Sequence, residues 1–246
     1  MKRIWTESNL DINATSATVS VQELNHLLRV LRARTGEAVE LINGRGEARI
    51  FHIPENINLK NTLTVHLEET PDNTLERSAT TPLIVRIGLF KDARWDILIE
   101  KLSELGVRRI EPLFTEYSVV KISPRDFNRK KEKWDATARA AYKQSGRLTQ
   151  LEIASPQSLQ EALSRPILEN SQELLFDPEA SLSLSSISHS KESLINVLWI
   201  GPEGGWSPKE QASLKERSQA ISLGPLILRA ETAAISVASY LRFASF

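Results

Sequence analysis

The sequence predicts an α/β protein in two parts: a small β-rich domain, then a mostly parallel sheet covered by helices. From Leu83 onward, apolar strands alternate with amphipathic helices, the pattern of a parallel sheet. The first part has short strands around tight turns, which is typical of a small barrel. Near the C-terminus, two apolar strands each run into a glycine-proline turn, Gly201-Pro202 and Gly224-Pro225.

The N-terminal part, residues 1–70, is expected to contain one helix among its strands. Ser20 and Glu23 form a capping-box pattern, and the leucines over 24–31 then recur on one helical face. A strand over 38–42 runs into Asn43-Gly44, a strong hairpin signal. Residues 71–82 are polar, with a proline near each end, and are predicted to be a linker to a second domain over 83–246.

In the second domain the elements are predicted from apolar runs and helix caps. Strands are expected at 83–90, 110–114, 151–154, 173–176, 194–200 and 220–223. Helices are expected from Asp92 to Gly106, from Ser123 to about Gln144, after the cap residue Ser207, and over 234–241. The serine-rich stretch 181–193 is expected to be a solvated loop.

Composition excludes several classes of chemistry. The chain of 246 residues carries 31 basic and 31 acidic side chains, so global charge does not indicate a nucleic-acid partner. Cysteine is absent, which removes disulfides and thiolate catalysis, and the four histidines share no metal-ligand spacing. No metal is therefore expected. Without a membrane-length apolar run or a leader peptide, the chain is expected to be soluble and cytoplasmic.

The two glycine-proline turns predict one ligand pocket. Ligands of α/β sheets sit outside the carboxyl ends of the strands, and glycine lets the backbone approach them closely. No GxxxxGK[ST] occurs, and no G-x-G-x-x-G follows the strand at Leu83, so phosphate-loop and dinucleotide folds are disfavoured. Glu203, Arg229 and Glu231 are the candidate polar site residues, although spacing alone does not show that they meet.

Basic side chains gather in two segments of this neutral chain. Residues 121–147 contain nine Lys/Arg and three Asp/Glu, and Arg29, Arg32, Arg45 and Arg49 form a second basic cluster. Such stripes neutralise phosphates, although a solvated helix face is an equally good explanation of the first one alone. Two clusters together favour a nucleic-acid partner.

Several segments closely resemble one family in the same order along the chain. IGPEGGWS (200–207) and LGPLILRAETAA (223–234) resemble the two C-terminal motifs of the RsmE family. HLLRVLRARTGEAVELINGRGE (26–47), KLSELGVRRIEPLFTEYSVVK (101–121) and KWDATARAAYKQSGR (133–147) resemble earlier blocks. These bacterial enzymes make N3-methyluridine in the 16S ribosomal RNA of the small subunit.

The resemblance implies a PUA-like β-barrel, an RNA-binding domain, followed by a SPOUT methyltransferase domain with a C-terminal trefoil knot. It also implies S-adenosyl-L-methionine as the cofactor, held by loops over 176–179, 200–205 and 223–228, and a homodimer. The cofactor-binding residues carried over are Phe176, Ile200, Gly201, Pro202, Glu203, Gly204, Gly205, Leu223, Gly224, Ile227 and Leu228.

The same resemblance, with the chemistry of the reaction, suggests roles for charged residues. Arg229 would steady the uracil or its phosphate, and Glu231 or Glu203 would orient Arg229 or relay the proton. The residues expected to hold rRNA phosphates are Arg29, Arg32, Arg139, Lys143 and Arg147.

Two alternatives stay open. A non-catalytic rRNA-binding assembly factor with the same fold is favoured only by Leu226, which stands where the family commonly has an arginine in LGPRILR. An α/β enzyme acting on another nucleotide ligand is disfavoured by the missing phosphate motifs.

Overall fold

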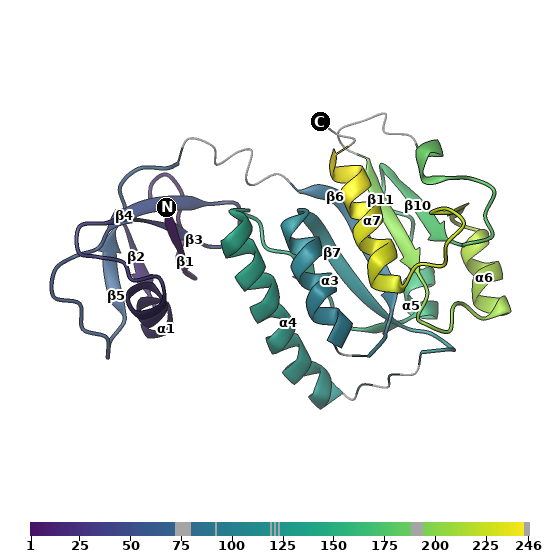
Figure 1. The fold of residues 1–246 in the computed structure, drawn as a ribbon, viewed down its shortest axis with the longest axis horizontal. Coiled ribbons are helices and arrows are strands. Elements are labelled where there is room, and N and C mark those ends of the chain that lie inside the picture. The colour runs from purple at the N-terminus through teal and green to yellow at the C-terminus, as the bar shows by residue number, and fades with distance from the viewer. Residues whose placement is uncertain are drawn as a thin grey trace. The chain divides into compact units, whose positions relative to one another are not determined.

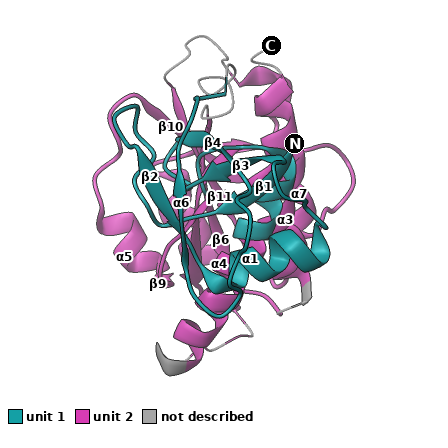
Figure 2. Ribbon diagram, turned by 90° about the vertical axis from the view of Figure 1, so that its left-hand side faces the viewer, with its two compact units in different colours: residues 1–79, 139–150 teal, residues 80–138, 151–246 magenta. Residues whose placement is uncertain are grey.

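The computed structural model describes residues 1–71, 80–91, 93–118, 120, 122, 124–187 and 194–243. The chain divides into two compact units (Figure 2): residues 1–79 with 139–150, and residues 80–138 with 151–246. Helix α4 (Pro124–Ser145) contributes residues to both units, which the sequence did not indicate. None of the described helices is long and apolar enough to cross a membrane.

The first unit holds two small sheets. Strand β3 (Ala38–Ile42) pairs in parallel with β1 (Lys2–Trp5) and antiparallel with β4 (Ala48–His52). Strand β2 (Ser16–Val19) pairs antiparallel with β5 (Leu63–His66). The Ile50 N–H donates to the Glu69 carbonyl and the Ile50 carbonyl accepts from the Glu68 N–H, which links β4 to the segment after β5. The described residues thus give a β-rich unit, while closure into a barrel remains a prediction.

The predicted helix of the first unit begins as expected and then changes its hydrogen-bonding pattern. The Ser20 side chain accepts a hydrogen bond from the Glu23 N–H and caps α1 (Val21–Asn25). The Glu23 carboxylate does not complete the capping box; it accepts hydrogen bonds from the Trp5 N–H and from Lys143. After α1, residues His26–Val30 form a π-helical turn, η1. The Asn43-Gly44 signal marks a longer loop, since Ile42 pairs with Ala48 across it.

The second unit is built on one seven-stranded sheet whose pairs are all parallel (Figure 1). The strand order is β12-β10-β11-β6-β7-β8, with β9 also paired to β7. The strands are β6 (Thr81–Gly88), β7 (Val107–Phe114), β8 (Glu152–Ile153), β9 (Gln157–Ser158), β10 (Ser171–Phe176), β11 (Ile195–Ile200) and β12 (Gln219–Ile221). The predicted parallel α/β fold is confirmed.

Alternation along each strand divides the core into two layers. Leu83, Val85 and Ile87 of β6 pack with α3 (Ala93–Glu104) and α7 (Ala230–Phe243) on one face, where α4 adds Trp134. The opposite face carries Trp199 of β11 and packs against α5 (Leu159–Ser164) and α6 (Pro208–Lys215). Successive side chains of a strand point to opposite faces, and helices cover both faces of this sheet. Apolar residues are therefore buried on both sides of its central strands.

Several details differ from the sequence prediction. Strand β7 begins three residues before the predicted start at Ile110, and α5 and β9 had no clear apolar period because they are very short. Part of the predicted linker, 72–79, lies outside the described residues, as do the expected cap residues Asp92 and Ser123, and β6 already starts at Thr81. In the serine-rich stretch, residues Leu184–Ser186 form a single 3-10 turn, η2, and 188–193 lie outside the described residues.

Candidate functional site

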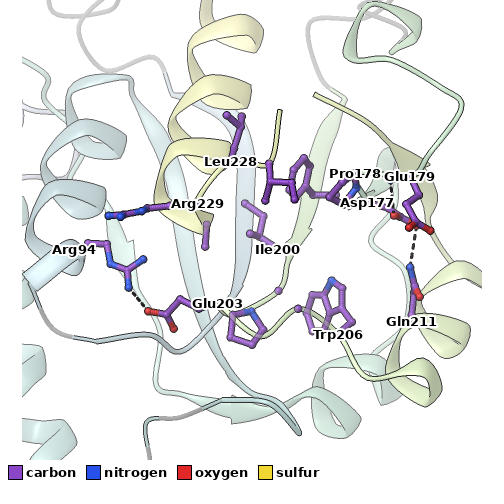
Figure 3. A pocket seen from close by; sticks show the side chains of 16 residues that line it. Arg94, Asp177, Pro178, Glu179, Ile200, Glu203, Trp206, Gln211, Leu228 and Arg229 are labelled. Carbon is purple, nitrogen blue, oxygen red and sulfur yellow. Dashed lines mark hydrogen bonds and ion pairs between the residues drawn. The ribbon is translucent and has the colours of Figure 1, made fainter. Parts of the chain in front are cut away.

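A cavity of about 760 Å³ lies at the carboxyl ends of β10 and β11, where the sequence predicted a pocket (Figure 3). Its walls come from three segments, 176–179, 200–206 and 227–230, with further residues from α3 and α6. The lining residues are Arg94, Phe176, Asp177, Pro178, Glu179, Ile200, Gly201, Pro202, Glu203, Gly205, Trp206, Gln211, Ile227, Leu228, Arg229 and Ala230. A cavity of this size holds a cofactor-sized ligand.

The turn after β11 is compact because its glycines leave room for backbone. A Cβ on Gly88, at the end of the neighbouring β6, would lie 2.6 Å from the Cδ of Pro202. Gly205 has φ +72° and donates its N–H to the Pro202 carbonyl at 2.9 Å. Directly after the turn, Ser207 and Glu210 form a complete capping box at the start of α6. The turn is therefore held between two buried strands and a capped helix.

Asp177 places a fixed negative charge on one wall of the cavity. Burial opposes its ionisation, but the Lys215 ammonium at 2.9 Å, the backbone N–H of Glu179 and the Gln211 amide outweigh that effect and hold the pKa of Asp177 below its usual value. Its carboxylate is therefore ionised at neutral pH.

Arg94, from the first turn of α3, contacts two acidic residues, Glu203 in the cavity wall and Glu231 outside it. Its guanidinium forms an ion pair with Glu203 (Figure 3). It also lies 3.5 Å from the carboxylate of Glu231, which is buried. It also lies over the ring of Phe90, 5.5 Å from the centroid. The site thus presents carboxylates and guanidinium groups side by side, which suits a ligand that carries both positive and negative groups.

Two protein-family models match this chain, one in each part of the sequence. A family model described as "RNA methyltransferase domain" matches residues 77–242, and one described as "RNA methyltransferase PUA domain" matches residues 19–57. The first match covers more than half of the chain. The chain belongs to the RNA methyltransferase family.

Individual relatives of this family match along nearly their whole length. Ribosomal RNA small subunit methyltransferase E of Rickettsia conorii is 29% identical over 245 residues, which cover 98% of this chain and 94% of the relative. The enzyme of the same name from Bacillus subtilis is 26% identical over 236 residues, covering 92% and 91%. The resemblance seen in the sequence motifs is confirmed.

Two solved structures of relatives are also similar. Ribosomal RNA small subunit methyltransferase E from Neisseria gonorrhoeae, described as bound to S-adenosyl methionine, superposes with a TM-score of 0.84 at 26% identity, covering 99% of this chain and 98% of that one. A putative methyltransferase from Legionella pneumophila, described as in complex with the bound cofactor SAM, gives 0.81 at 27% identity, covering 98% and 97%.

Most residues that the family resemblance assigned to the cofactor line the cavity. Those that do are Phe176, Ile200, Gly201, Pro202, Glu203, Gly205, Ile227 and Leu228. Gly204, Leu223 and Gly224 do not: a Cβ on Gly204 would lie 3.0 Å from the Cβ of Tyr117, and Leu223 packs against the core. Gly224 has φ +109°, which fits glycine at the bend of the loop. The roles of all these residues remain predictions.

The two predicted catalytic residues have different surroundings. Arg229 is exposed, lines the cavity, and has no ion-pair partner in the part of the chain that the structure describes. Glu231 does not line the cavity and pairs with Arg94. The hypothesis that Glu203 or Glu231 orients Arg229 is therefore not what the structure shows, since both carboxylates face Arg94.

Sequence reasoning missed four lining residues: Arg94, Trp206, Gln211 and Ala230. Trp206 and Ala230 lie within the two quoted motifs, directly after the cofactor loop 200–205 and directly after Arg229, but the resemblance assigned neither of them a role. Arg94 gave a weaker signal, namely a basic residue just after β6, the strand that neighbours β11. Leu226, beside the cavity, is 75% exposed.

The predicted RNA-contact residues all lie in the first unit and divide into two groups. Arg29 and Arg32 are exposed, and Arg32 has φ +52° just after η1. Arg139 lies 4.0 Å above the Trp5 ring, and Lys143 forms an ion pair of 2.9 Å with Glu23. Arg147 is buried. Arg29 and Arg32 are thus the more accessible cations.

The described residues contain no group of three or more His, Cys, Asp or Glu side chains that could hold a metal ion.

Proposed function

We propose that this chain transfers the methyl group of S-adenosyl-L-methionine to N3 of a uridine in the 16S ribosomal RNA of the small subunit. The observation that carries the proposal is the cavity at the ends of β10 and β11, lined by the two motifs that relate the chain to this family. Relatives matched over almost the whole chain are named as small-subunit rRNA methyltransferases, and two similar structures are described with the cofactor.

The residues around the cavity fit this cofactor. Ionised Asp177, with Glu179 and Glu203 on the rim, suits the positive charges of a sulfonium and an amino group. Phe176, Ile200, Trp206 and Leu228 offer apolar surface for an aromatic base. The compact turn around Gly201 leaves backbone groups accessible. When bound, the cofactor supplies a methyl group already activated by its sulfonium.

The protein must then present N3 and manage its proton. N3 lies on the Watson–Crick edge, so the uridine has to be unpaired or turned out of a helix. Arg229, an exposed cation with no ion pair to any residue that the structure describes, would stabilise negative charge that develops on the uracil as N3 loses its proton. Glu203, at the rim, is the more accessible candidate to accept that proton, and the buried Glu231 would position Arg94.

Finer features of the family belong to the same proposal. We infer a PUA-like barrel, a trefoil knot, a homodimer and a cytoplasmic location. For the knot, the support is that the end of β12 is tied to the loop after β10, through hydrogen bonds of Asp177 N–H to Ile221 O at 3.0 Å and Ser222 N–H to Leu182 O at 2.7 Å. The chain then returns to α7, which packs in the core over β6. Arg29 and Arg32 would hold RNA phosphates. Arg139, Lys143 and Arg147 would also do so, but Arg139 stacks on Trp5, Lys143 is paired with Glu23 and Arg147 is buried, so their contacts with RNA would be fewer.

A transfer assay tests the function. Full-length protein, labelled S-adenosyl-L-methionine and small subunits lacking the modification should yield label at N3 of one uridine. Arg229→Ala should lower turnover by about 100-fold, the usual effect of losing one transition-state donor, while cofactor binding is retained. Lys209→Ala, an exposed residue of α6 outside the cavity wall, is the matched control and should not change turnover.

The outcomes separate the proposal from its rival. Absence of transfer with every form of the subunit would refute the enzyme. Cofactor binding measured as thermal stabilisation would speak against a non-catalytic assembly factor, because a ligand that binds only the folded state raises the melting temperature. Loss of cofactor binding in Arg229→Ala would refute the role given to Arg229.

A further inference from the structure

A second cavity, of about 360 Å³, opens between the N-terminal halves of β6 and β7 and the segment after α5. Four guanidinium groups and two carboxylates line it: Arg86, Arg108, Arg109 and Arg165, with Glu111 and Glu152. The wall therefore carries two positive charges more than negative ones. Nothing in the methyl-transfer site uses these residues.

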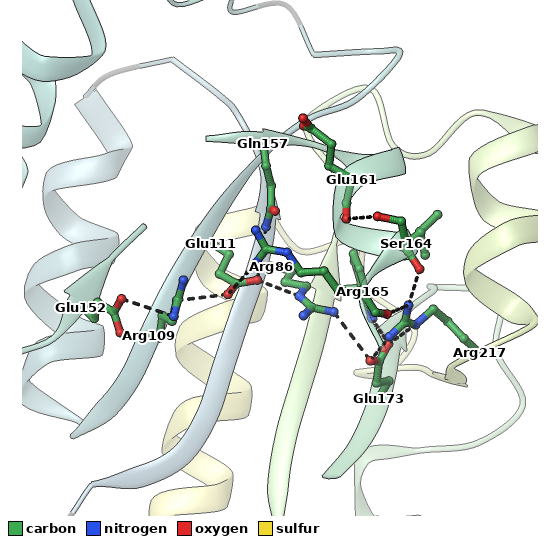
Figure 4. A network of polar contacts seen from close by, with 12 residues as sticks. Arg86, Arg109, Glu111, Glu152, Gln157, Glu161, Ser164, Arg165, Glu173 and Arg217 are labelled. Carbon is green, nitrogen blue, oxygen red and sulfur yellow. Dashed lines mark hydrogen bonds and ion pairs between the residues drawn. The ribbon is translucent and has the colours of Figure 1, made fainter. Parts of the chain in front are cut away.

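Arg86 is the buried centre of the network behind this cavity (Figure 4). Arg86 and Glu111 are direct neighbours across β6 and β7, and their side chains form a 2.8 Å hydrogen bond. Arg86 is 3% exposed, and among the described residues its Nη1 has no hydrogen-bond partner, because the Glu173 oxygen paired with it is 3.6 Å away. This buried guanidinium, held between two carboxylates, forms the floor of the cavity.

The outer arginines are only loosely engaged. Arg165 is half exposed and lies 4.0 Å from Glu111, too far for a hydrogen bond. Arg108 is exposed and has no ion-pair or hydrogen-bond partner among the residues that the structure describes. Arg109, by contrast, already contacts Glu111 at 3.0 Å and Glu152 at 3.3 Å. The guanidinium groups of Arg108 and Arg165 are thus the two that an outside ligand can reach most readily.

We propose that this cavity binds a phosphate group, and specifically a backbone phosphate of the RNA substrate. Guanidinium forks match the oxygens of a phosphate in bidentate geometry, and the surplus of positive charge matches an anion. The phosphate site stands on the arginine geometry alone, while the choice of RNA as its source rests on the proposed function.

The second cavity is separate from the cavity proposed for methyl transfer, so it would contact a different part of the RNA. Ile195, at the start of β11, lines this cavity, and Ile200, at its end, lines the first one. Five residues of extended strand span about 16 Å. One RNA strand could therefore reach both cavities, so that the arginine site would position the RNA without reading its sequence.

The experiment compares Arg108→Ala/Arg165→Ala with a charge-matched control, Lys60→Ala/Lys101→Ala. In the first arm, binding of a mixed-sequence single-stranded oligoribonucleotide is measured over a range of KCl concentrations. The arginine variant should bind about tenfold more weakly at low salt. Its slope of log K against log [KCl] should be shallower by about 0.7 for each lost phosphate contact. The control should keep the wild-type affinity and slope. In the second arm, inorganic phosphate is titrated by ³¹P NMR, and its binding should be lost in the arginine variant only.

The arms distinguish the possible sources of the phosphate. An unchanged RNA slope together with unchanged phosphate binding would overturn the proposal. Loss of phosphate binding with an unchanged RNA slope would support the phosphate site and overturn RNA as its source. A control that weakens RNA binding as much as the arginine variant would overturn the assignment to this cavity. Cofactor binding, measured in both variants, should match wild type, and neither arm depends on methyl transfer.

Discussion

Replacing Arg86 by methionine should destabilise the second unit through the carboxylates that it leaves behind. The side chains of Arg86 and Glu111 are each 4% exposed, and that of Glu173 is 1% exposed. Removing one member of a buried ion pair typically costs about 3–5 kcal/mol, because the remaining charge stays buried. After the substitution, Glu111 still has an ion pair with Arg109 at 3.0 Å, and Glu173 still has one with Arg217 at 2.5 Å. The lower part of that range therefore applies.

Packing of the new side chain offsets part of the loss. The Arg86 guanidinium lies 4.5 Å from the centroid of the Trp199 ring, and methionine would place a thioether near the same ring. We therefore expect Arg86→Met to lower the free energy of unfolding by about 2–3 kcal/mol, and the melting temperature by about 5–10 °C for a chain of this size. Arg129→Met, an exposed arginine of α4, is the control and should change stability by less than about 0.5 kcal/mol.

Thermal unfolding followed by tryptophan fluorescence and calorimetry measures this effect. The double variant Arg86→Met/Glu111→Leu should be more stable than Arg86→Met alone, because it removes the orphaned carboxylate together with its partner. A loss below about 1 kcal/mol for Arg86→Met would show that the network is hydrated rather than buried. If the stability losses of Arg86→Met and of Glu111→Leu, each measured alone, simply add up to the loss of the double variant, the pair is not coupled.

Three further predictions follow from individual contacts. Asp177→Asn should lower the free energy of unfolding by only about 0.5–1 kcal/mol, because the Lys215 partner is half exposed. The folded state lowers the pKa of Asp177, so the stability difference from wild type should be complete above about pH 4 and should disappear as the pH falls further, as measured by melting curves. Gly88→Ala should weaken cofactor binding measured by calorimetry, because its Cβ would meet Pro202 at 2.6 Å and displace the cavity turn; wild-type affinity would contradict this. Tyr142→Phe should be neutral or stabilising by about 1 kcal/mol in urea unfolding, because the buried phenol, whose pKa is raised by burial, has no hydrogen-bond partner among the described residues; a clear loss of stability would contradict this.

Much of the fold could be predicted because buried parallel strands are continuous apolar runs. The predicted strand over 194–200 differs by one residue from β11 (Ile195–Ile200), and the Ser207 capping box is present in full. The order of the strands could not be predicted in this way. Strand β10 lies between β11 and β12 because of pairings between distant segments, and local periodicity does not encode which strands pair.

The candidate site was predictable where backbone chemistry determined it. A glycine-proline turn at the end of an apolar strand marks a close backbone approach, and Gly201 and Pro202 do line the cavity. The partner of Glu203 was not predictable, because Arg94 precedes it by 109 positions in the chain. An ion pair at that separation depends on the neighbouring strands β6 and β11, and has no signature in the local sequence.

Counting charges in the basic segments does not show which of their cations are accessible to a ligand. A local excess of lysine and arginine over 121–147 records formal charge, but it does not record how many of those groups are already paired. Lys143 is held by Glu23 at 2.9 Å, and Arg139 is stacked on Trp5. The arginines of the second cavity, in contrast, come from three separate places in the chain: Arg86, the pair Arg108-Arg109, and Arg165. In a chain of zero net charge, we expect RNA to meet the cations that the fold gathers and pairs least. Arg108, which has no partner among the described residues, and Arg165, whose Glu111 partner is 4.0 Å away, fit that expectation better than Lys143, which is held by Glu23.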